Sequence, residues 1–304
     1  MSRQLVECVP NYSEGRRPDV IDALVAPFRG RPGVHLLVHR ADPDHNRLVV
    51  SLVGEPEPLQ TALIESARVA IDAIDLRAHR GAHPRMGAVD VIPFVPVRGI
   101  SMDGCVELAR AFADRYVKAT GVPVYLYEAA AIRADRKNLE DVRKGQFEAL
   151  REESKLPERQ PDRGGPGIHP SAGATAIGAR PFLVAFNINL KSGDLALARS
   201  IARAVRASAG GMPCVKAVGI PLRERGIVQV SINITDYAAA PIHAVLERVR
   251  QKAAESGVEV LETEIYGLVP AAALLAAAER SLQLTGFDAA QVLDLRLLDL
   301  IGKG

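Results

Sequence analysis

The sequence predicts an α+β fold made of two similar halves, each an antiparallel sheet with helices on one face. Both halves contain the element order strand, helix, strand, strand, helix, strand, which is the order of a split βαβ sandwich. Polar turns at Asp42–Asn46 and Arg223–Gly226 each join two strands as a hairpin. A doubly wound parallel sheet would instead alternate strands strictly with helices, so these hairpins argue against it.

In the first half, strands are expected where β-branched and apolar residues run together, and helices where apolar residues recur every three or four positions. The clearest helix has Leu59, Leu63, Ala67 and Ala70 on one stripe. The expected strands are Leu5–Pro10, Val34–His39, Arg47–Val53, Val89–Val97 and Val122–Tyr127, and the expected helices are Asp19–Phe28, Pro58–Ile74 and Met102–Thr120.

The second half repeats this order after a segment without either period. Its expected strands are Phe182–Leu190, Val215–Pro221, Ile227–Ile234 and Val258–Ile265, and its expected helices are Leu195–Ser208 and Ile242–Ser256. The segment between the halves, Lys155–Gly173, carries four prolines and four glycines. Its composition fits a plain linker. It fits a binding loop equally, because long loops are often functional and glycines let a backbone approach a flat ligand closely. We place the domain boundary at its end, giving domains 1–178 and 179–304.

Composition excludes several classes of protein. The 304 residues are 48% hydrophobic, enough for a substantial core, and the net charge of +2 supports neither a nucleic-acid partner nor a membrane surface. Cys8, Cys105 and Cys214 lie far apart, which indicates buried thiols in a reducing compartment. The N-terminus has no apolar signal region, and the longest apolar stretch, Gly267–Ala278, is shorter than the ~20 residues of a spanning helix. We therefore expect a cytoplasmic protein.

The segment 77–90 concentrates groups that can carry chemistry. It holds two imidazoles, His79 and His83, among several arginines, and an imidazole exchanges protons near neutral pH. The spacing of the two histidines resembles that of a zinc helix, but Arg80 stands where the general base is needed, and the glycine and proline within the segment would break the helix. We predict no metal. A loop held together by hydrogen bonds of these side chains is the alternative.

Gly173–Gly178 is the segment of the chain that most resembles a nucleotide-binding motif. These residues match the first half of a phosphate-binding loop, but Ala179 and Arg180 stand where Lys and Ser or Thr must contact phosphate and magnesium. No Gly-x-Gly-x-x-Gly follows a strand elsewhere in the chain. We therefore predict that no nucleotide binds.

The chain carries six specific ungapped blocks, which are Leu5–Gly15, Asp42–Arg47, His79–Gly87, Val122–Tyr127, His169–Thr175 and Phe182–Asn189. Together these blocks resemble the glutamate formimidoyltransferase (formiminotransferase) family over roughly residues 3–290. The resemblance implies two ferredoxin-like subdomains, a homodimer, and transfer of the formimidoyl group from N-formimidoyl-L-glutamate to N5 of the co-substrate tetrahydrofolate in histidine degradation. The family's catalytic histidine falls on His83. The family's folate-binding stretch falls on Gly164, Gly165, Pro166, Gly167, Ile168, His169, Pro170, Ser171, Ala172 and Gly173.

The chemistry of that transfer suits the segment independently. The attacking folate nitrogen must lose a proton and the departing glutamate nitrogen must gain one, so a single imidazole near neutrality can serve both steps. We predict that His83, rather than His79 or His169, is this group. Both substrates carry carboxylates, and the candidate anion-binding residues are Arg47, Arg80, Arg85 and Arg98. For each arginine taken singly, a solvated surface position fits equally.

The chain departs from the family pattern at two places. Family members commonly carry Glu at the position of Ala82 and an acidic residue where Val38 and Arg40 stand. If a carboxylate normally supports the histidine, its loss favours a related donor such as N-formylglutamate. Formyl transfer to tetrahydrofolate and a non-catalytic folate-binding protein are therefore the alternatives. We expect the ligand between the two halves, and a separate cyclodeaminase, since the chain ends at Gly304.

Overall fold

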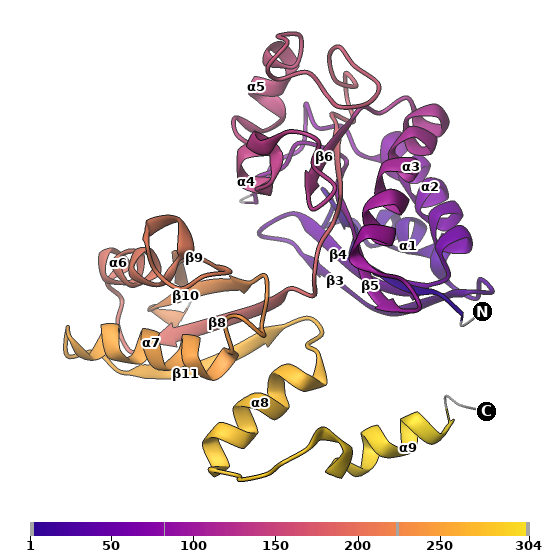
Figure 1. Ribbon diagram of the computed structural model, residues 1–304. Helices are drawn as coiled ribbons and strands as arrows, with labels where there is room; N and C mark the ends of the chain where they lie inside the picture. Colours follow the sequence, from indigo (N-terminus) through magenta and orange to yellow (C-terminus); the bar gives the residue numbers. More distant parts are fainter. Residues whose placement is uncertain (1–2, 82, 223–224, 302–304) are drawn as a thin grey trace. The chain divides into compact units, whose positions relative to one another are not determined.

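A computed structural model describes residues 3–81, 83–222 and 225–301 of the chain (Figure 1). The chain divides into two compact units, one ending at Pro181 and the other beginning at Phe182. Within the described ranges, no helix is both long enough and apolar enough to cross a bilayer.

The first unit is built on a seven-stranded sheet in which two short strands share one position. β1 and β2 both lie between β4 and β5 and are antiparallel to each. Pro10, which has no N–H to donate, falls between them, so they form one interrupted strand. The strand bounds are β1 Leu5–Cys8, β2 Asn11–Tyr12, β3 Val34–Asp42, β4 Arg47–Gly54, β5 Val89–Arg98, β6 Val124–Glu128 and β7 Thr175–Ala179. The lateral order β5, β1, β4, β3 is antiparallel throughout, as predicted for the first half.

The prediction of a purely antiparallel sheet is nevertheless wrong for this half. Beyond β5 the sheet continues with β7 and β6, and both β5–β7 and β6–β7 are parallel pairs. The sequence analysis missed β7, because Thr175–Ala179 consists of small residues that alternate in neither period. All five residues are buried, as befits a parallel strand covered on both faces.

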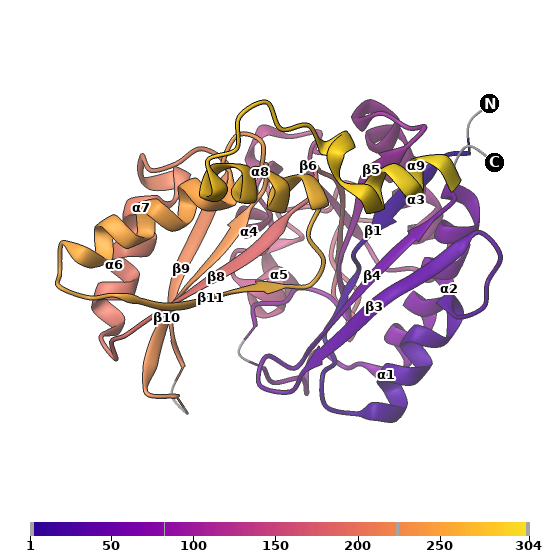
Figure 2. The same cartoon turned by 90° about the horizontal axis from the view of Figure 1, so that it is seen from below.

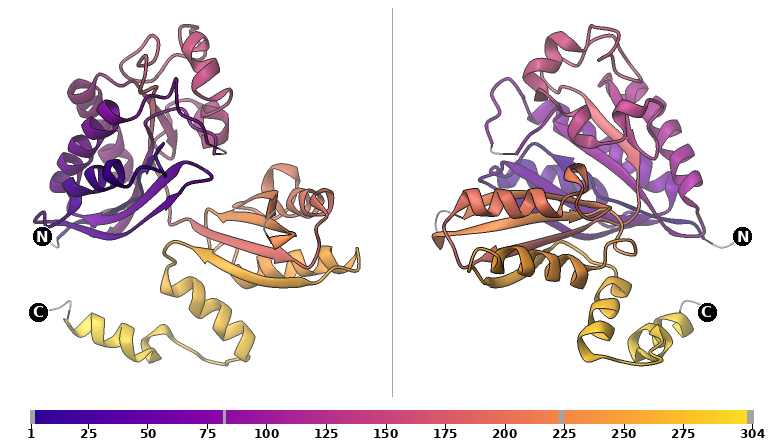
Figure 3. Two further views of the ribbon diagram at one scale, coloured as in Figure 1. Left: turned by 180° about the vertical axis from the view of Figure 1, so that it is seen from behind. Right: turned by 60° about the vertical axis from the view of Figure 1, so that its left-hand side comes forward.

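Helices cover both faces of this sheet, so the prediction of helices on one face is also wrong here. Side chains of β6 alternate between two cores: Val124 and Leu126 pack with α3, whereas Tyr125 and Tyr127 pack with Val142 of α4. Figures 1 and 3 show α1, α2 and α3 on one side of the sheet and α4 and α5 on the other. The helix bounds are α1 Pro18–Val25, α2 Pro56–Ala73, α3 Met102–Thr120, α4 Leu139–Val142 and α5 Gln146–Glu153. α4 and α5 are too short to give a helical period, and they were not predicted.

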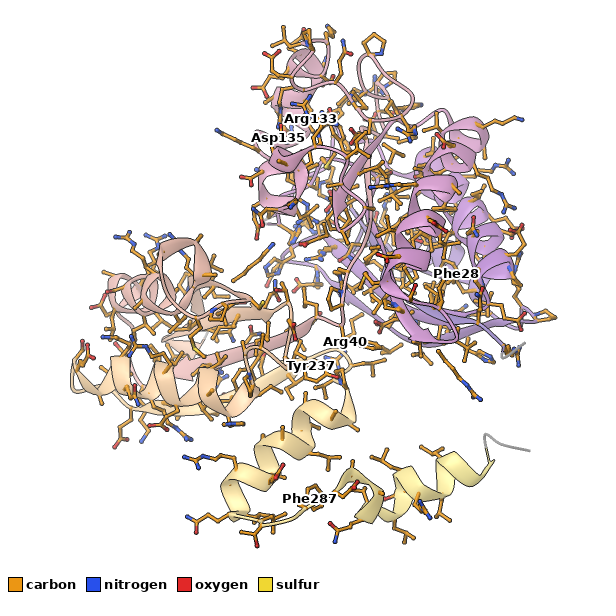
Figure 4. All side chains as sticks on the ribbon, in the orientation of Figure 1. Phe28, Arg40, Arg133, Asp135, Tyr237 and Phe287 are labelled. Carbon is orange, nitrogen blue, oxygen red and sulfur yellow. The ribbon has the colours of Figure 1, made fainter. Side chains whose placement is uncertain are left out.

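Helix α3 begins and ends where predicted, because both ends carry capping residues. The Ser101 hydroxyl accepts the Gly104 N–H at the start, and Gly121 adopts a left-handed conformation at the end. Its inner face contributes Phe112, which meets Phe94 of β5 edge to face at 5.4 Å between ring centroids. Phe28, labelled in Figure 4, is buried in the same core. Of the three free cysteines, two are buried as predicted, whereas Cys214 is only half-buried.

The second unit has the four-stranded antiparallel sheet that the sequence predicts, in the order β11, β8, β10, β9 (Figure 2). Helices α6 and α7 share one apolar core with Val184, Phe186, Ile188 and Leu190, which lie on one face of β8. The bounds are β8 Val184–Leu190, β9 Val215–Leu222, β10 Ile227–Ile234, β11 Val260–Tyr266, α6 Leu195–Val205 and α7 Ile242–Ala254.

Two helices of the second unit were not predicted, α8 Ala271–Leu282 and α9 Leu293–Ile301. Their leucine- and alanine-rich sequence gives no clear stripe to separate helix from buried strand. Arg223 and Glu224 of the expected β9–β10 turn lie outside the described residues.

Candidate functional site

A small cavity in the first unit gathers most of the predicted chemistry. Three chain segments form its wall: the end of β2, the turn between β3 and β4, and the segment that enters β5. The lining residues are Tyr12, Ser13, His45, Asn46, Arg47, His79, His83, Arg85 and Asp90.

Asn46 fastens the β3–β4 turn to its neighbours. It adopts a left-handed backbone at φ 50°, which asparagine tolerates. Its side-chain oxygen accepts the Gly15 N–H at 2.9 Å, and its side-chain nitrogen donates to the Arg80 carbonyl at 2.9 Å. Gly81 permits this approach, because a Cβ at that position would lie 2.3 Å from the His45 carbonyl oxygen. The turn and the histidine segment are therefore held in backbone contact.

His83 lies in the cavity beside a guanidinium group. Its Nε2 accepts a hydrogen bond from Nη1 of Arg47, which also donates through Nη2 to the Asn11 side chain. Burial, together with the positive charges of Arg47 and Arg143 and the neighbouring His45, lowers the pKa of His83 to about 2. The imidazole is therefore neutral at pH 7, and Nε2 carries a lone pair rather than a proton.

His79 is buried and has a structural set of partners. Its Nε2 lies 3.1 Å from the Asn46 carbonyl oxygen, and its Nδ1 accepts from Nε of Arg85 at 3.3 Å. Burial lowers the pKa of His79, against the hydrogen bond to Asn46. Arg85 in turn makes a two-pronged ion pair with Glu148 of α5, at 2.6 and 2.7 Å. His79 thus links the turn to Arg85, and the described part of the chain contains no group of three His, Cys, Asp or Glu residues placed to hold a metal.

The four predicted anion-binding arginines divide into two pairs. Arg47 and Arg85 line the cavity. Arg80 is exposed and donates to the backbone carbonyls of Arg77 and His79. Arg98 ends β5, whose residue Asp90 lines the cavity, so Arg98 lies about 26 Å along the strand from that wall at ~3.3 Å per residue.

The predicted folate-binding stretch, residues 164–173, adjoins the histidine segment at its C-terminal end. The Ala88 N–H donates to the Ala172 carbonyl at 2.9 Å, and the Ala174 N–H donates to the Met86 carbonyl at 3.0 Å. Gly173 is at φ 72°, and a Cβ there would lie 2.1 Å from the Met86 oxygen. The first part of the stretch, Gly164–Pro166, is exposed.

Several residues of the site were not singled out from the sequence. Asp90 is buried, accepts the Met86 N–H at 2.8 Å and pairs with Arg143. It thereby holds the backbone just after His83. Arg143 and Glu148 lie more than fifty residues away in sequence, in a region without a clear period, so no local signal identifies them. His45 lies in the block Asp42–Arg47, which the sequence analysis gave as a polar turn and as part of the family resemblance without assigning His45 a role.

Comparison with known proteins decides the family. A model described as "Formiminotransferase domain, N-terminal subdomain" matches residues 5–180, and one described as "Formiminotransferase domain" matches residues 185–288. The chain belongs to the formiminotransferase family. It is 44% identical over 296 residues to "Glutamate formimidoyltransferase" of Streptococcus pyogenes serotype M1, covering 97% of this chain and 99% of that one. It is 42% identical to the protein of the same name from Thermoplasma acidophilum, covering 96% and 97%.

Some relatives in the formiminotransferase family are longer. The chain is 45% identical to "Formimidoyltransferase-cyclodeaminase" of Rattus norvegicus over 90% of its own length, which is 52% of that protein. The family resemblance seen in the sequence blocks is therefore confirmed.

The departures from the formiminotransferase pattern have different positions. Ala82 lies outside the described residues. Val38 and Arg40 are on β3, opposite Ser51 and Val49 of β4, and Arg40 is labelled in Figure 4. Asp42 ends the same strand, and its Oδ2 lies 2.8 Å from Nδ1 of His45.

Proposed function

We propose that this protein transfers the formimidoyl group from N-formimidoyl-L-glutamate to N5 of tetrahydrofolate, releasing L-glutamate, as a step of histidine degradation. The observation that carries this proposal is near full-length likeness, at 44% identity, to a protein named glutamate formimidoyltransferase. The contact between His83 and Arg47 in the cavity supports it chemically, because one group can move a proton and the other can bind a carboxylate.

We propose that His83 accepts the proton that N5 loses. The half-buried imidazole is neutral, which is the form a base requires. Its Nε2 lone pair is occupied by Arg47. A substrate carboxylate bound to Arg47 would draw the guanidinium away and offset its charge. The lone pair would then be free, and the pKa of His83 would rise toward its usual range.

The two cavity arginines would have different tasks. Arg47 lines the cavity and donates to the His83 imidazole and the Asn11 amide, so a carboxylate bound to it would lie beside the proposed base. Arg85 already holds the Glu148 carboxylate with both terminal nitrogens. We therefore assign carboxylate binding to Arg47 and placement of His79 to Arg85.

The folate co-substrate is proposed to bind along residues 164–173. Backbone groups of Gly164–Pro166 are accessible to a flat ring, and the end of the stretch pairs with the segment that follows His83. Amide hydrogen exchange with and without tetrahydrofolate tests this assignment. Slower exchange is expected at the non-proline residues of the stretch, and exchange that tetrahydrofolate leaves unchanged there would contradict it.

Turnover assays test the reaction. Tetrahydrofolate consumption should proceed with formimidoylglutamate and much less with formylglutamate, and His83→Ala should lower kcat by about 10²-fold with little change in tetrahydrofolate affinity. The exposed His35 of β3 provides a matched control, and His35→Ala should behave as the wild type. Faster turnover with formylglutamate would instead support the formyl-transfer alternative, and tetrahydrofolate binding without any turnover would support a folate-binding protein.

Three further proposals follow from family membership. The strand orders β5-β1-β4-β3 and β11-β8-β10-β9 are the same permutation of the chain order, which supports ferredoxin-like subdomains. We propose a homodimer, to be tested by light scattering coupled to gel filtration. We also propose that a cyclodeaminase consumes the product, since the longer relatives carry that second name.

A further inference from the structure

A second imidazole lines the same cavity as His83 and has a carboxylate behind it. The rings of His45 and His83 have centroids 6.3 Å apart and are tilted by 59°. His45 Nδ1 lies 2.8 Å from Asp42 Oδ2. A carboxylate can only accept, so Nδ1 carries the proton of this hydrogen bond. The outward nitrogen, Nε2, has no hydrogen-bond partner among the residues that the structure describes.

The turn itself holds the carboxylate in place. Asp42 Oδ1 accepts the backbone N–H groups of Asp44 and His45, each at 2.9 Å. Although burial acts in the opposite direction, these bonds and the imidazole hold the pKa of Asp42 below its usual range. The carboxylate is thus charged and fixed, and it can stabilise a positive charge on the His45 ring.

The two imidazoles have different surroundings, as expected if one accepts a proton and the other donates one. His83 is half-buried and faces guanidinium groups, which can donate but not accept. The His45 side chain is 45% exposed and faces a carboxylate. One ring faces hydrogen-bond donors, and the other faces a carboxylate acceptor and is open to water.

We propose that His45 is a second proton-transfer residue, which delivers a proton to the departing glutamate nitrogen while His83 receives the proton from N5. This inference rests on the proposed formimidoyl transfer and deepens it. The two nitrogens are bonded to one carbon at that stage, and rings 6.3 Å apart can each reach one of them through a hydrogen bond of about 2.6–3.2 Å.

The step balances without another reactant. As the bond from N5 to the formimidoyl carbon forms, the proton on N5 passes to His83 Nε2. As the bond from that carbon to the glutamate nitrogen breaks, its electron pair stays on the nitrogen, which takes the proton from His45 Nε2. After product release one proton leaves His83 and one returns to His45 through water, so the enzyme is restored.

Asp42 at the end of β3 and His45 in the following turn form a carboxylate-supported imidazole. The charged or titratable groups around this imidazole come from its own turn, from Arg16 and from the cavity wall. They are Asp42 and Asp44, Arg16, whose Nε donates to the Pro43 carbonyl, and Tyr12, Arg47, His79, His83, Arg85 and Asp90.

The test compares His45→Ala with His35→Ala in full-length protein, using formimidoylglutamate and tetrahydrofolate. We expect His45→Ala to lower kcat by about 10²-fold, with tetrahydrofolate affinity within about twofold of the wild type. The fall of kcat at high pH, where a general acid loses its proton, should flatten. Free imidazole should restore at least about 10-fold of the lost kcat, because the ring's place at the exposed edge of the cavity is then open.

The conservative variants sharpen the outcome. His45→Gln should keep the fold and the low kcat but gain nothing from imidazole, and Asp42→Asn should lower kcat by about 10-fold. A His45→Ala protein that turns over at the wild-type rate overturns the inference. So does one that loses activity with an unaltered pH profile and no imidazole response, since His45 would then be structural. A wild type and His35→Ala that both fail to use formimidoylglutamate would overturn the proposed function, and the inference with it.

Discussion

Replacing Gly173 by alanine should cost much more stability than the same change at a comparable glycine. Gly173 is at φ 72°, a conformation that costs a residue with a Cβ about 1–2 kcal/mol. The new Cβ would also lie 2.1 Å from the Met86 carbonyl oxygen, so the two segments must separate. Separation breaks the two backbone hydrogen bonds beside it, each worth about 0.5–1.5 kcal/mol. The total loss is about 2–5 kcal/mol.

Gly121 provides the control within the same unit. It is at φ 70° but has nothing within 4 Å of an added Cβ, so Gly121→Ala should cost only the backbone term of about 1–2 kcal/mol. Urea denaturation of both variants at pH 7 gives the free energies of unfolding. Gly173→Ala should also lose turnover, because the segment it displaces follows His83. Equal losses of stability in the two variants would show that the contact contributes nothing.

Three further outcomes are expected. The pKa of His83 is about 2 in the folded protein and 6.5 when unperturbed, so between these pH values the unfolded chain binds a proton that the folded protein does not. From pH 6.5 to pH 5 the free energy of unfolding of the wild type should therefore fall by at most about 2 kcal/mol more than that of His83→Gln. Parallel curves of stability against pH for the two proteins would refute this. Arg136→Met strands the buried Asp162 carboxylate, now 2.5 Å from the guanidinium, and should cost about 3–5 kcal/mol in urea denaturation; a loss below 1 kcal/mol would argue against a charged pair. Glu148→Gln loosens Arg85 and should lower kcat/KM by about 10-fold while changing the free energy of unfolding by less than about 1 kcal/mol; unchanged kinetics would separate Arg85 from the site.

The elements that could be predicted from the sequence are those with a strong period or a clear end. Met102–Thr120 and Ile227–Ile234 match the observed α3 and β10 at both ends. The antiparallel pairing of β3 with β4 follows from the hairpin through Asp42–Asn46. β7 escaped prediction because a strand buried on both faces alternates in neither period. Its position between β5 and β6 depends on contacts made across the whole first unit.

The site could be located from the sequence but not assembled. The cluster around His79 and His83 marks the segment, because such side chains are rarely gathered in a loop without a task. The partners that orient this segment are distant in the sequence. Glu148 pairs with Arg85 and Arg143 pairs with Asp90, each across more than fifty residues. Only tertiary packing creates these pairs. Arg98, placed with the others by residue type alone, lies at the opposite end of β5.

The position of β7 has a consequence for the order in which the protein forms. β5 and β6 are neighbours in the chain on either side of α3, yet neither pairs with the other, since β7 lies between them. β7 is synthesised about fifty residues after β6, so in the nascent chain β5 and β6 have no strand to pair with between them until β7 is made. Long-range parallel pairing is also slow, because the entropy of loop closure is lost before the stabilising strand contacts form. The hydrogen bonds of Met86 and Ala88 to the segment just before β7 also form only when that segment is present. The cavity is therefore completed late, and a chain interrupted before Thr175 lacks the completed cavity.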